Sequence, residues 1–217
     1  MPKSYAFKIW ILLLTFSSGF LNALALERFS FPVSHYTGAV SRAALAFIKG
    51  DFKSFFSIFL LFSCFFCGAF VSGAIFYKRK FLLNKRYGLF LMSFAFVLFC
   101  VFFFHINNLY SCCIFAFILG MQNGFFIYYD GLIVRTTHIT GYLTDAAFAL
   151  GAALRGNTEK KHFIFFYLIS IFCFFSGGIF LFAVPENYEL LTASFLYLIS
   201  GLFYFLLRKR VLKTSGK

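Results

Sequence analysis

Six long apolar runs dominate this chain and leave few folds open to it. They lie at about 9–26, 55–77, 87–105, 111–128, 163–183 and 190–207. Apolar runs of this length are typical of helices that cross a bilayer, because about 20 helical residues span its hydrocarbon core. We therefore predict an all-α polytopic membrane protein with six transmembrane helices.

The composition agrees with this class and narrows the partners. Of the 217 residues, 61% are hydrophobic and only 12% are charged, whereas soluble domains are about 25% charged. The connections between the apolar runs are short, so we expect a single membrane domain over 1–217. The net charge of +13 comes from short basic runs between the apolar ones. This pattern is typical of cytoplasmic loops and predicts a lipid bilayer as partner and no nucleic acid.

Six cysteines all fall inside the apolar runs, where cysteine acts as a small hydrophobic residue. Cys64 and Cys67 have the spacing of a redox or metal pair, but no histidine lies near them in the sequence. We therefore expect no metal and no cofactor.

The chain contains an internal repeat. The segment 34–47, "SHYTGAVSRAALAF", aligns with 137–150, "THITGYLTDAAFAL", at an offset of 103 residues. Upstream, "GFLNA" at 19–23 aligns with "GMQNG" at 120–124 at an offset of 101 residues, and "FCGA" at 66–69 resembles "FSGG" at 175–178. The two repeats cover 9–105 and 111–207, each with a Gly-x-x-Asn span, a polar His-x-Thr-Gly segment and two further spans.

These motifs also carry a family resemblance. The second-half sequence "GMQNG…VRTTHITGYLTD", and more loosely its first-half counterpart, resembles the YoaK family of bacterial multi-pass inner-membrane proteins over nearly the whole chain. Members of that family usually have Asn after the first His-x-Thr-Gly, whereas this chain has Ala39. The family is uncharacterised, so the resemblance implies a fold and a location but no activity.

The loop charges favour polar segments that enter the membrane and return to the same side. With six spans and both termini cytoplasmic, 16 of the 20 Lys and Arg residues lie on one side. Eight full crossings, the alternative, leave a basic cluster on the wrong side whichever way the chain is oriented. An odd number of spans per repeat inverts the second repeat. This is an arrangement found in secondary transporters, with two short re-entrant or broken helices meeting at the bilayer midplane.

The polar segments supply the candidate site. Ser34 and Thr137 suit the N-cap position, so a half-helix is expected to begin at each following histidine. Free N–H groups at two facing helix N-termini would suit a small anion or the carboxylate of a zwitterion. The candidate substrate-binding residues come from the repeated motifs. They are His35, Thr37, Gly38, His138, Thr140, Gly141, Asn22 and Asn123.

Structural roles are the alternative for these residues, since a turn inside a membrane also needs partners for its backbone groups. Arg42 and Asp145 occupy equivalent repeat positions, so an inverted repeat predicts an ion pair or gate between them. Gly120-x-x-x-Gly124 and Gly19-x-x-x-Ala23 are expected to hold the first and fourth spans close together.

The function predicted on these grounds is small-solute secondary transport, with a small molecule or ion as substrate. A passive channel and a structural or accessory subunit are the alternatives. We expect no enzyme, since the chain has no Ser/His/Asp order, no metal-type His-Glu spacing and no phosphate-binding glycine loop. A homo-oligomer is left open, as is the identity of the substrate.

Overall fold

The computed structural model describes residues 5–77, 83–125, 127–129, 132–159 and 161–215. Eight α-helices account for most of this part of the chain, together with one short hairpin and one 3-10 turn. The helices are α1 (Tyr5–Phe29), α2 (Tyr36–Ile48), α3 (Phe52–Ile75), α4 (Lys85–Phe103), α5 (Asn108–Asn123), α6 (Ile139–Leu154), α7 (Lys161–Leu181) and α8 (Glu189–Ser215). The hairpin pairs β1 (Ile127–Tyr129) with β2 (Leu132–Val134), and the turn η1 (Glu186–Tyr188) precedes α8.

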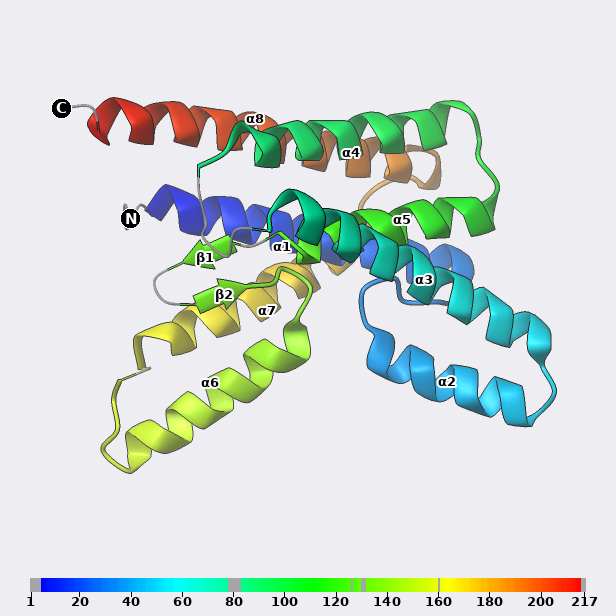
Figure 1. The fold of residues 1–217 in the computed structure, drawn as a ribbon, viewed down its shortest axis with the longest axis horizontal. Helices are drawn as coiled ribbons and strands as arrows, with labels where there is room; N and C mark the ends of the chain where they lie inside the picture. The colour runs from blue at the N-terminus through cyan, green and yellow to red at the C-terminus, as the bar shows by residue number, and fades with distance from the viewer. Residues whose placement is uncertain (1–4, 78–82, 126, 130–131, 160, 216–217) are drawn as a thin grey trace.

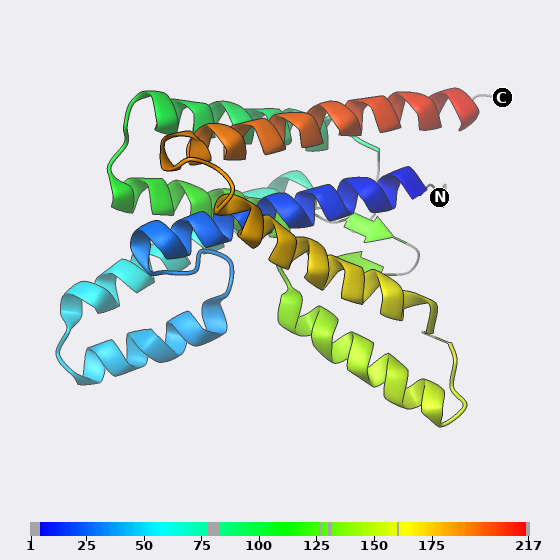
Figure 2. The same ribbon diagram turned by 180° about the vertical axis from the view of Figure 1, so that it is seen from behind.

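The long helices pack side by side in three pairs. α4 lies along α8, α1 along α7, and α3 along α5. α1 also contacts α5 and α8, which joins the pairs into one body. In Figure 1 the helices α4 and α8 form the upper layer, and the hairpins α2–α3 and α6–α7 diverge at the lower edge; Figure 2 shows the same arrangement from behind.

Five helices among the described residues are long and apolar enough to cross a membrane, namely α1, α3, α4, α7 and α8. The sixth predicted span, 111–128, does not form as expected. Its helix α5 ends at Asn123 and has 16 residues, which is about 24 Å at 1.5 Å per residue. Ile127–Tyr129 then belong to the hairpin instead, after the chain leaves the helix at Gly124.

In both halves of the chain, the segment before the half-helix doubles back toward the middle of the molecule. α1 ends at Phe29, and the strap Ser30–His35 returns the chain toward the middle of the molecule, where α2 begins (Figure 1). α2 then runs back toward the end that α1 had reached. In the second half, the chain returns from the hairpin β1–β2 to the middle, and α6 runs out toward the opposite end.

Glycines set the closest helix crossings. A Cβ on Gly19 would overlap the backbone carbonyl of Phe174 in α7, and a Cβ on Gly120 would overlap that of Phe65 in α3. The small-residue seams therefore join α1 to α7 and α5 to α3. Our prediction that they hold α1 against α5 was wrong, because the glycine faces of both helices point to other partners.

The partner helix also contributes a glycine to each crossing. A Cβ on Gly68 of α3 would overlap the Phe117 carbonyl of α5, and a Cβ on Gly177 of α7 would overlap the Phe16 carbonyl of α1. Backbones can approach this closely only where neither helix carries a side chain at the crossing point. The two crossings therefore depend on glycine from both partners.

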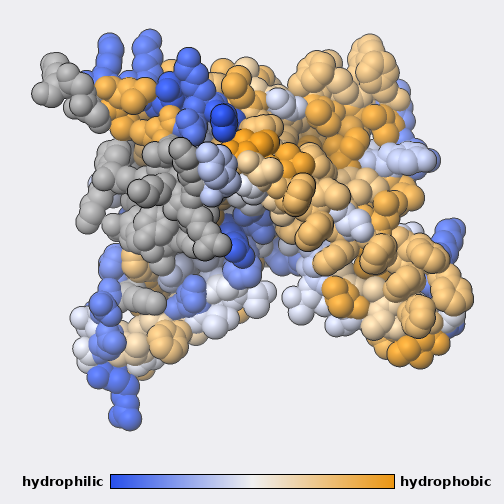
Figure 3. All heavy atoms as spheres, viewed as in Figure 1, coloured by the Kyte–Doolittle hydropathy of each residue, from blue (hydrophilic) through white to orange (hydrophobic). Residues whose placement is uncertain are grey.

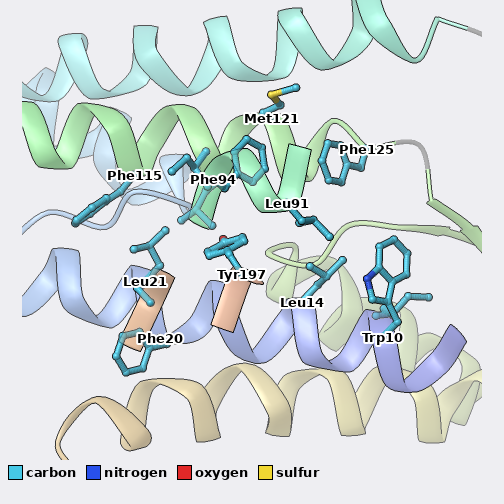
Figure 4. Close-up of a cluster of buried hydrophobic side chains, with 14 of the residues drawn as sticks. Trp10, Leu14, Phe20, Leu21, Leu91, Phe94, Phe115, Met121, Phe125 and Tyr197 are labelled. Atoms are coloured by element: carbon cyan, nitrogen blue, oxygen red, sulfur yellow. The ribbon is translucent and has the colours of Figure 1, made fainter. Parts of the chain in front are cut away.

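Large apolar and aromatic side chains fill the space between α1, α4, α5 and α8. Trp10, Leu14, Phe115 and Phe125 are almost completely buried there, and Figure 4 shows Tyr197 between α1 and α5 in the middle of this cluster. Polar contacts fix α8 against its neighbours: the Trp10 indole donates to the Ser200 carbonyl at 3.1 Å. These contacts make the upper layers a packed scaffold.

One ion pair ties the end of α1 to the start of α8. The Arg28 guanidinium donates to the Glu189 carboxylate from both Nε, at 2.8 Å, and Nη2, at 2.6 Å, and Nη2 also donates to the Glu186 carbonyl. The Glu189 side chain is 7% exposed, whereas that of Arg28 is 31% exposed. Arg28 therefore holds the two helices together.

Candidate functional site

The two polar segments meet at the centre of the molecule. α2 and α6 both begin there and run outward in opposite directions, away from one another (Figure 1). Figure 3 shows a hollow between the two lower lobes, with less apolar residues at its inner end than on the outer faces of the lobes. His35 and His138 occupy the N-cap positions of the two half-helices and lie close enough to interact electrostatically.

The first histidine belongs to a short hydrogen-bonded chain. The Asn22 side-chain oxygen accepts from the Val33 N–H at 3.1 Å and from the Ser34 hydroxyl at 2.8 Å. The Ser34 oxygen lies 2.8 Å from Nδ1 of His35, whose ring also contacts the Phe174 ring edge-on at 5.5 Å. Asn22 and Ser34 are 5% and 7% exposed, so this chain, which we call the Asn22 latch, is buried.

The latch fixes which nitrogen of His35 carries the proton. The buried Val33 N–H needs an acceptor, so the amide oxygen of Asn22 must face it. Ser34 then has to donate its only hydroxyl proton to that same oxygen. Nδ1 of His35 must therefore donate to Ser34, and Nε2 of the neutral ring is left as an acceptor for another group.

The predicted caps lie one residue from where we placed them. We expected Ser34 and Thr137 at the N-cap positions, but the histidines occupy them, and neither α2 nor α6 receives a side-chain cap bond. By contrast, Asp51 caps α3 and Asn107 caps α5. The first turns of α2 and α6 therefore carry backbone donors and positive dipole ends without a side-chain cap.

The glycines of the two motifs play different parts. The imidazole of His138 folds over the first turn of α6, where a Cβ on Gly141 would overlap it. A Cβ on Gly38 would meet nothing within 4 Å. Thr37 and Thr140 lie in the first turns of α2 and α6 and are both exposed, as is His138, whereas His35 is half-buried.

The second half does not repeat the Asn22 latch. Asn123 and Thr137 are the counterparts of Asn22 and Ser34, but their oxygens Oδ1 and Oγ1 are buried and have no hydrogen-bond partner among the described residues. Thr137 is only 1% exposed. Buried oxygens without a hydrogen-bond partner are costly and unusual.

A different set of side chains anchors the second strap, residues 135–138, which leads from β2 into α6. The amide nitrogen of Gln122, itself 1% exposed, donates to Thr136 at 2.7 Å and to Ser18 of α1 at 2.8 Å. Its oxygen accepts from the Tyr197 hydroxyl at 2.7 Å. This network joins α1, α5 and α8 to the strap before α6. In the sequence, Gln122 is noticeable as an amide within an apolar run. No sequence feature indicates that Thr136 or Tyr197 belongs to the network.

The predicted ion pair between Arg42 and Asp145 is not formed in the described part of the chain. The Arg42 guanidinium donates to the Ser30 carbonyl at 3.1 Å and lies over the Phe31 ring at 5.1 Å, which fastens the first strap. Both residues are exposed. The reason is geometric: α2 and α6 diverge from their N-termini, so positions seven residues beyond the histidines move apart (Figure 1).

Two apolar grooves lie between described helices. A groove of about 500 Å³ between α2 and α3 is lined by side chains such as Val40, Phe47 and Phe59, and exposes almost no polar surface. Another of about 480 Å³ lies between α3, α4 and α5 and is similarly apolar. These surfaces suit lipid chains and not a polar solute. Among the described residues, no group of three or more His, Cys, Asp or Glu side chains could hold a metal ion.

Comparison with known proteins identifies the family and goes no further. Neither the curated proteins nor the solved structures gave a match. The family model described as "Protein of unknown function (DUF1275)" matches residues 10–206, which is nearly the whole chain. DUF1275 is the YoaK family, so the match confirms the resemblance that the two His-x-Thr-Gly motifs indicated. The chain therefore belongs to the DUF1275 family of helical, membrane-type proteins.

Proposed function

We propose that this protein is a small-solute secondary transporter whose substrate binds between the N-termini of α2 and α6. The observation that carries the proposal is that α2 and α6 begin near one another at the centre of the bundle, with His35 and His138 at their N-cap positions (Figure 1). Ionisable groups inside a membrane protein are costly and mark substrate pathways more often than structural positions. Broken helices whose N-termini face a central site are the usual construction of such pathways.

The proposal includes an inverted internal repeat, 9–105 and 111–207. Matched crossings support it: Gly19 meets Phe174 as Gly120 meets Phe65, and Gly68 meets Phe117 as Gly177 meets Phe16. Each contact is converted into the other by the sequence offsets of the two repeats, 101 and 109 residues. In addition, α1 and α5 run in opposite directions, as do α4 and α8 (Figure 1).

The proposed membrane topology has six crossings, with α5 as a short sixth span, and both termini in the cytoplasm of a bacterium. Both termini lie at one end of the molecule, and α4 starts with Lys85 and Arg86 near that end (Figure 1). Lys78, Arg79, Lys80 and Lys160, on which the charge argument also relies, lie outside the described residues. The Arg28–Glu189 pair lies at the opposite end, near the turns that lead into α8.

The chemistry of the centre suits a small solute with negative charge and a proton to donate. The first turns of α2 and α6 carry backbone donors and positive dipole ends without a side-chain cap. Nε2 of His35, as fixed by the Asn22 latch, is an acceptor. A zwitterion, with its carboxylate at a helix N-terminus and its ammonium group toward an acceptor, would satisfy both kinds of group. We propose no catalytic step and no cofactor.

The test is ligand-induced thermal stabilisation of the purified protein. Acetate, glycolate, glycine, glutamate and phosphate would be compared for the rise in thermal midpoint that each produces. We expect at least one of them to stabilise the wild type and His162→Ala, a histidine outside the centre, but not the double variant His35→Ala/His138→Ala. An equal rise in the double variant would reject the site.

Transport itself distinguishes the proposal from its main alternative. A passive channel would use the same helix ends, but flux through it would not saturate and would not depend on a coupling gradient. Uptake of the stabilising solute into proteoliposomes should saturate and respond to an imposed proton or sodium gradient. Flux that is proportional to concentration under all gradients would favour the channel.

A further inference from the structure

The two straps that lead into the half-helices are held in different ways. In the first half, Asn22 accepts from Val33 and Ser34, and Ser34 in turn accepts from His35. The Asn22 side-chain oxygen, the Ser34 hydroxyl and Nδ1 of His35 are thus all paired. The equivalent atoms of the second half, Oδ1 of Asn123 and Oγ1 of Thr137, are buried and have no partner among the described residues.

The second half nevertheless has the side chains needed for the same latch. Asn123 follows Gly120 as Asn22 follows Gly19, and Thr137 precedes His138 as Ser34 precedes His35. A threonine hydroxyl can donate to an amide oxygen and accept from an imidazole, as the serine does. The latch is therefore chemically complete in the second half but open in this conformation.

We propose that the two latches close alternately: a second conformation pairs Asn123 with Thr137 and His138 while Asn22 and Ser34 separate. The inference rests on the proposed transporter function, in which two inverted halves exchange conformations about a fixed site. The present structure is then the state with the first latch closed and the second open. With the proposed topology, the closed latch lies on the outer side of the centre and the open latch on the cytoplasmic side.

A fixed difference between the halves is the competing explanation. Gln122 binds Thr136 one residue before the latch positions, and Leu21 stands where the first half would need the same amide. The Gln122 network could have replaced the second latch permanently. The two explanations differ in one respect. Only alternate closing of the latches predicts that the second strap becomes more ordered when the first latch is weakened.

Hydrogen–deuterium exchange of the full-length protein in lipid nanodiscs tests this difference. Backbone exchange would be followed by mass spectrometry in peptides covering 31–38 and 135–142. In Ser34→Ala we expect several-fold faster exchange over 31–38 and, together with it, several-fold slower exchange over 135–142. Adding Thr137→Val, which removes the second hydroxyl but keeps the side-chain shape, should abolish the slowing. Ser41→Ala, an exposed serine on α2, is the control.

A gentler variant covers the case in which Ser34→Ala does not fold. Thr137→Ser gives the second half the residue of the first and should slow exchange over 135–142 while speeding it over 31–38. The proposal is overturned if 135–142 is unchanged or faster in both variants, which would establish a fixed asymmetry. Solute binding at the histidines is measured separately by thermal stabilisation, so the transporter proposal survives that outcome.

Discussion

The two halves of the chain, 9–105 and 111–207, agree in how their helices cross and differ in how their polar segments are held. The crossings are matched glycine for glycine, at Gly19 and Gly120 and at Gly68 and Gly177. The polar segments are not matched. The first strap is fixed by the Asn22 latch, whereas the second is fixed by Gln122, and Oδ1 of Asn123 and Oγ1 of Thr137 have no partner among the described residues.

This difference indicates which features are constrained by packing and which by chemistry. A helix crossing that brings backbones together tolerates only glycine, so the same residue is needed on both sides of the molecule. A buried polar group only needs some partner, and different side chains can provide one. The apolar frame is therefore the common element of the two halves, and the straps are where they differ.

The largest expected effect tests the agreement between the halves. Gly19→Ala and Gly120→Ala each place a methyl group against a backbone carbonyl. Each should therefore lower the free energy of unfolding by about 3 kcal/mol, and the two losses should be similar. The thermal midpoint in mild detergent, calibrated with a denaturant series, measures this. Gly73→Ala, on the open face of α3, is the control and should be neutral or slightly stabilising. A large cost for one glycine alone would break the similarity.

The second-largest effect tests the difference in how the two straps are held. Gln122→Leu installs the residue that the first half has at the equivalent position, Leu21. It removes the partner of the Tyr197 hydroxyl and one partner of Thr136, so we expect a loss of about 2 kcal/mol in the same assay. Asn187→Ala, an exposed amide in the turn before α8, is the matched control. An unchanged midpoint would mean that the network does not anchor the second strap.

The sequence predicts the long apolar helices but not the contacts of the polar centre, and the reason is physical. Long apolar runs have one stable solution in a bilayer, so α1, α3, α4, α7 and α8 follow directly from them. The paired His-x-Thr-Gly motifs likewise placed His35 and His138 at the starts of two half-helices. The end of α5 at Asn123 was missed, because the apolar run continues beyond it into the hairpin.

Which polar groups pair depends on distances that the sequence does not contain. Asn22 is predicted as a substrate-binding residue from its motif alone, but its side-chain oxygen accepts from Val33 and Ser34 of the strap that follows its helix. Tyr197 is one of 12 tyrosines, and nothing in its sequence context distinguishes it. The expected pairing of Arg42 with Asp145 failed because equivalence in a repeat does not imply contact.

A smaller effect compares the two hydroxyls directly. Ser34→Ala removes a bonded hydroxyl and should cost about 1 kcal/mol, whereas Thr137→Val removes an unpaired buried one and should be neutral or stabilising. The two thermal midpoints should therefore shift in different directions or by clearly different amounts. Equal losses would mean that Thr137 has a partner as good as that of Ser34.

The smallest effect concerns Arg42 and Asp145. Because Arg42 contacts Ser30 and Phe31 instead of Asp145, the double variant Arg42→Ala/Asp145→Asn should show the sum of the single effects, with a coupling energy of about 0 kcal/mol. A double-mutant cycle of thermal midpoints measures this. A coupling of about 1 kcal/mol or more would show that the two side chains meet in a conformation other than this one.

The most direct measurement of the central claim, that two half-helices enter from opposite sides and meet in the middle, is the sidedness of their outer ends. Single cysteines would be placed at Phe52, after α2, and at Thr158, after α6, in a chain without its native cysteines, and labelled with a membrane-impermeant thiol reagent. In intact spheroplasts we expect labelling at position 52 and none at 158, with the reverse in inside-out vesicles. Labelling of both positions from one side would contradict the inverted arrangement.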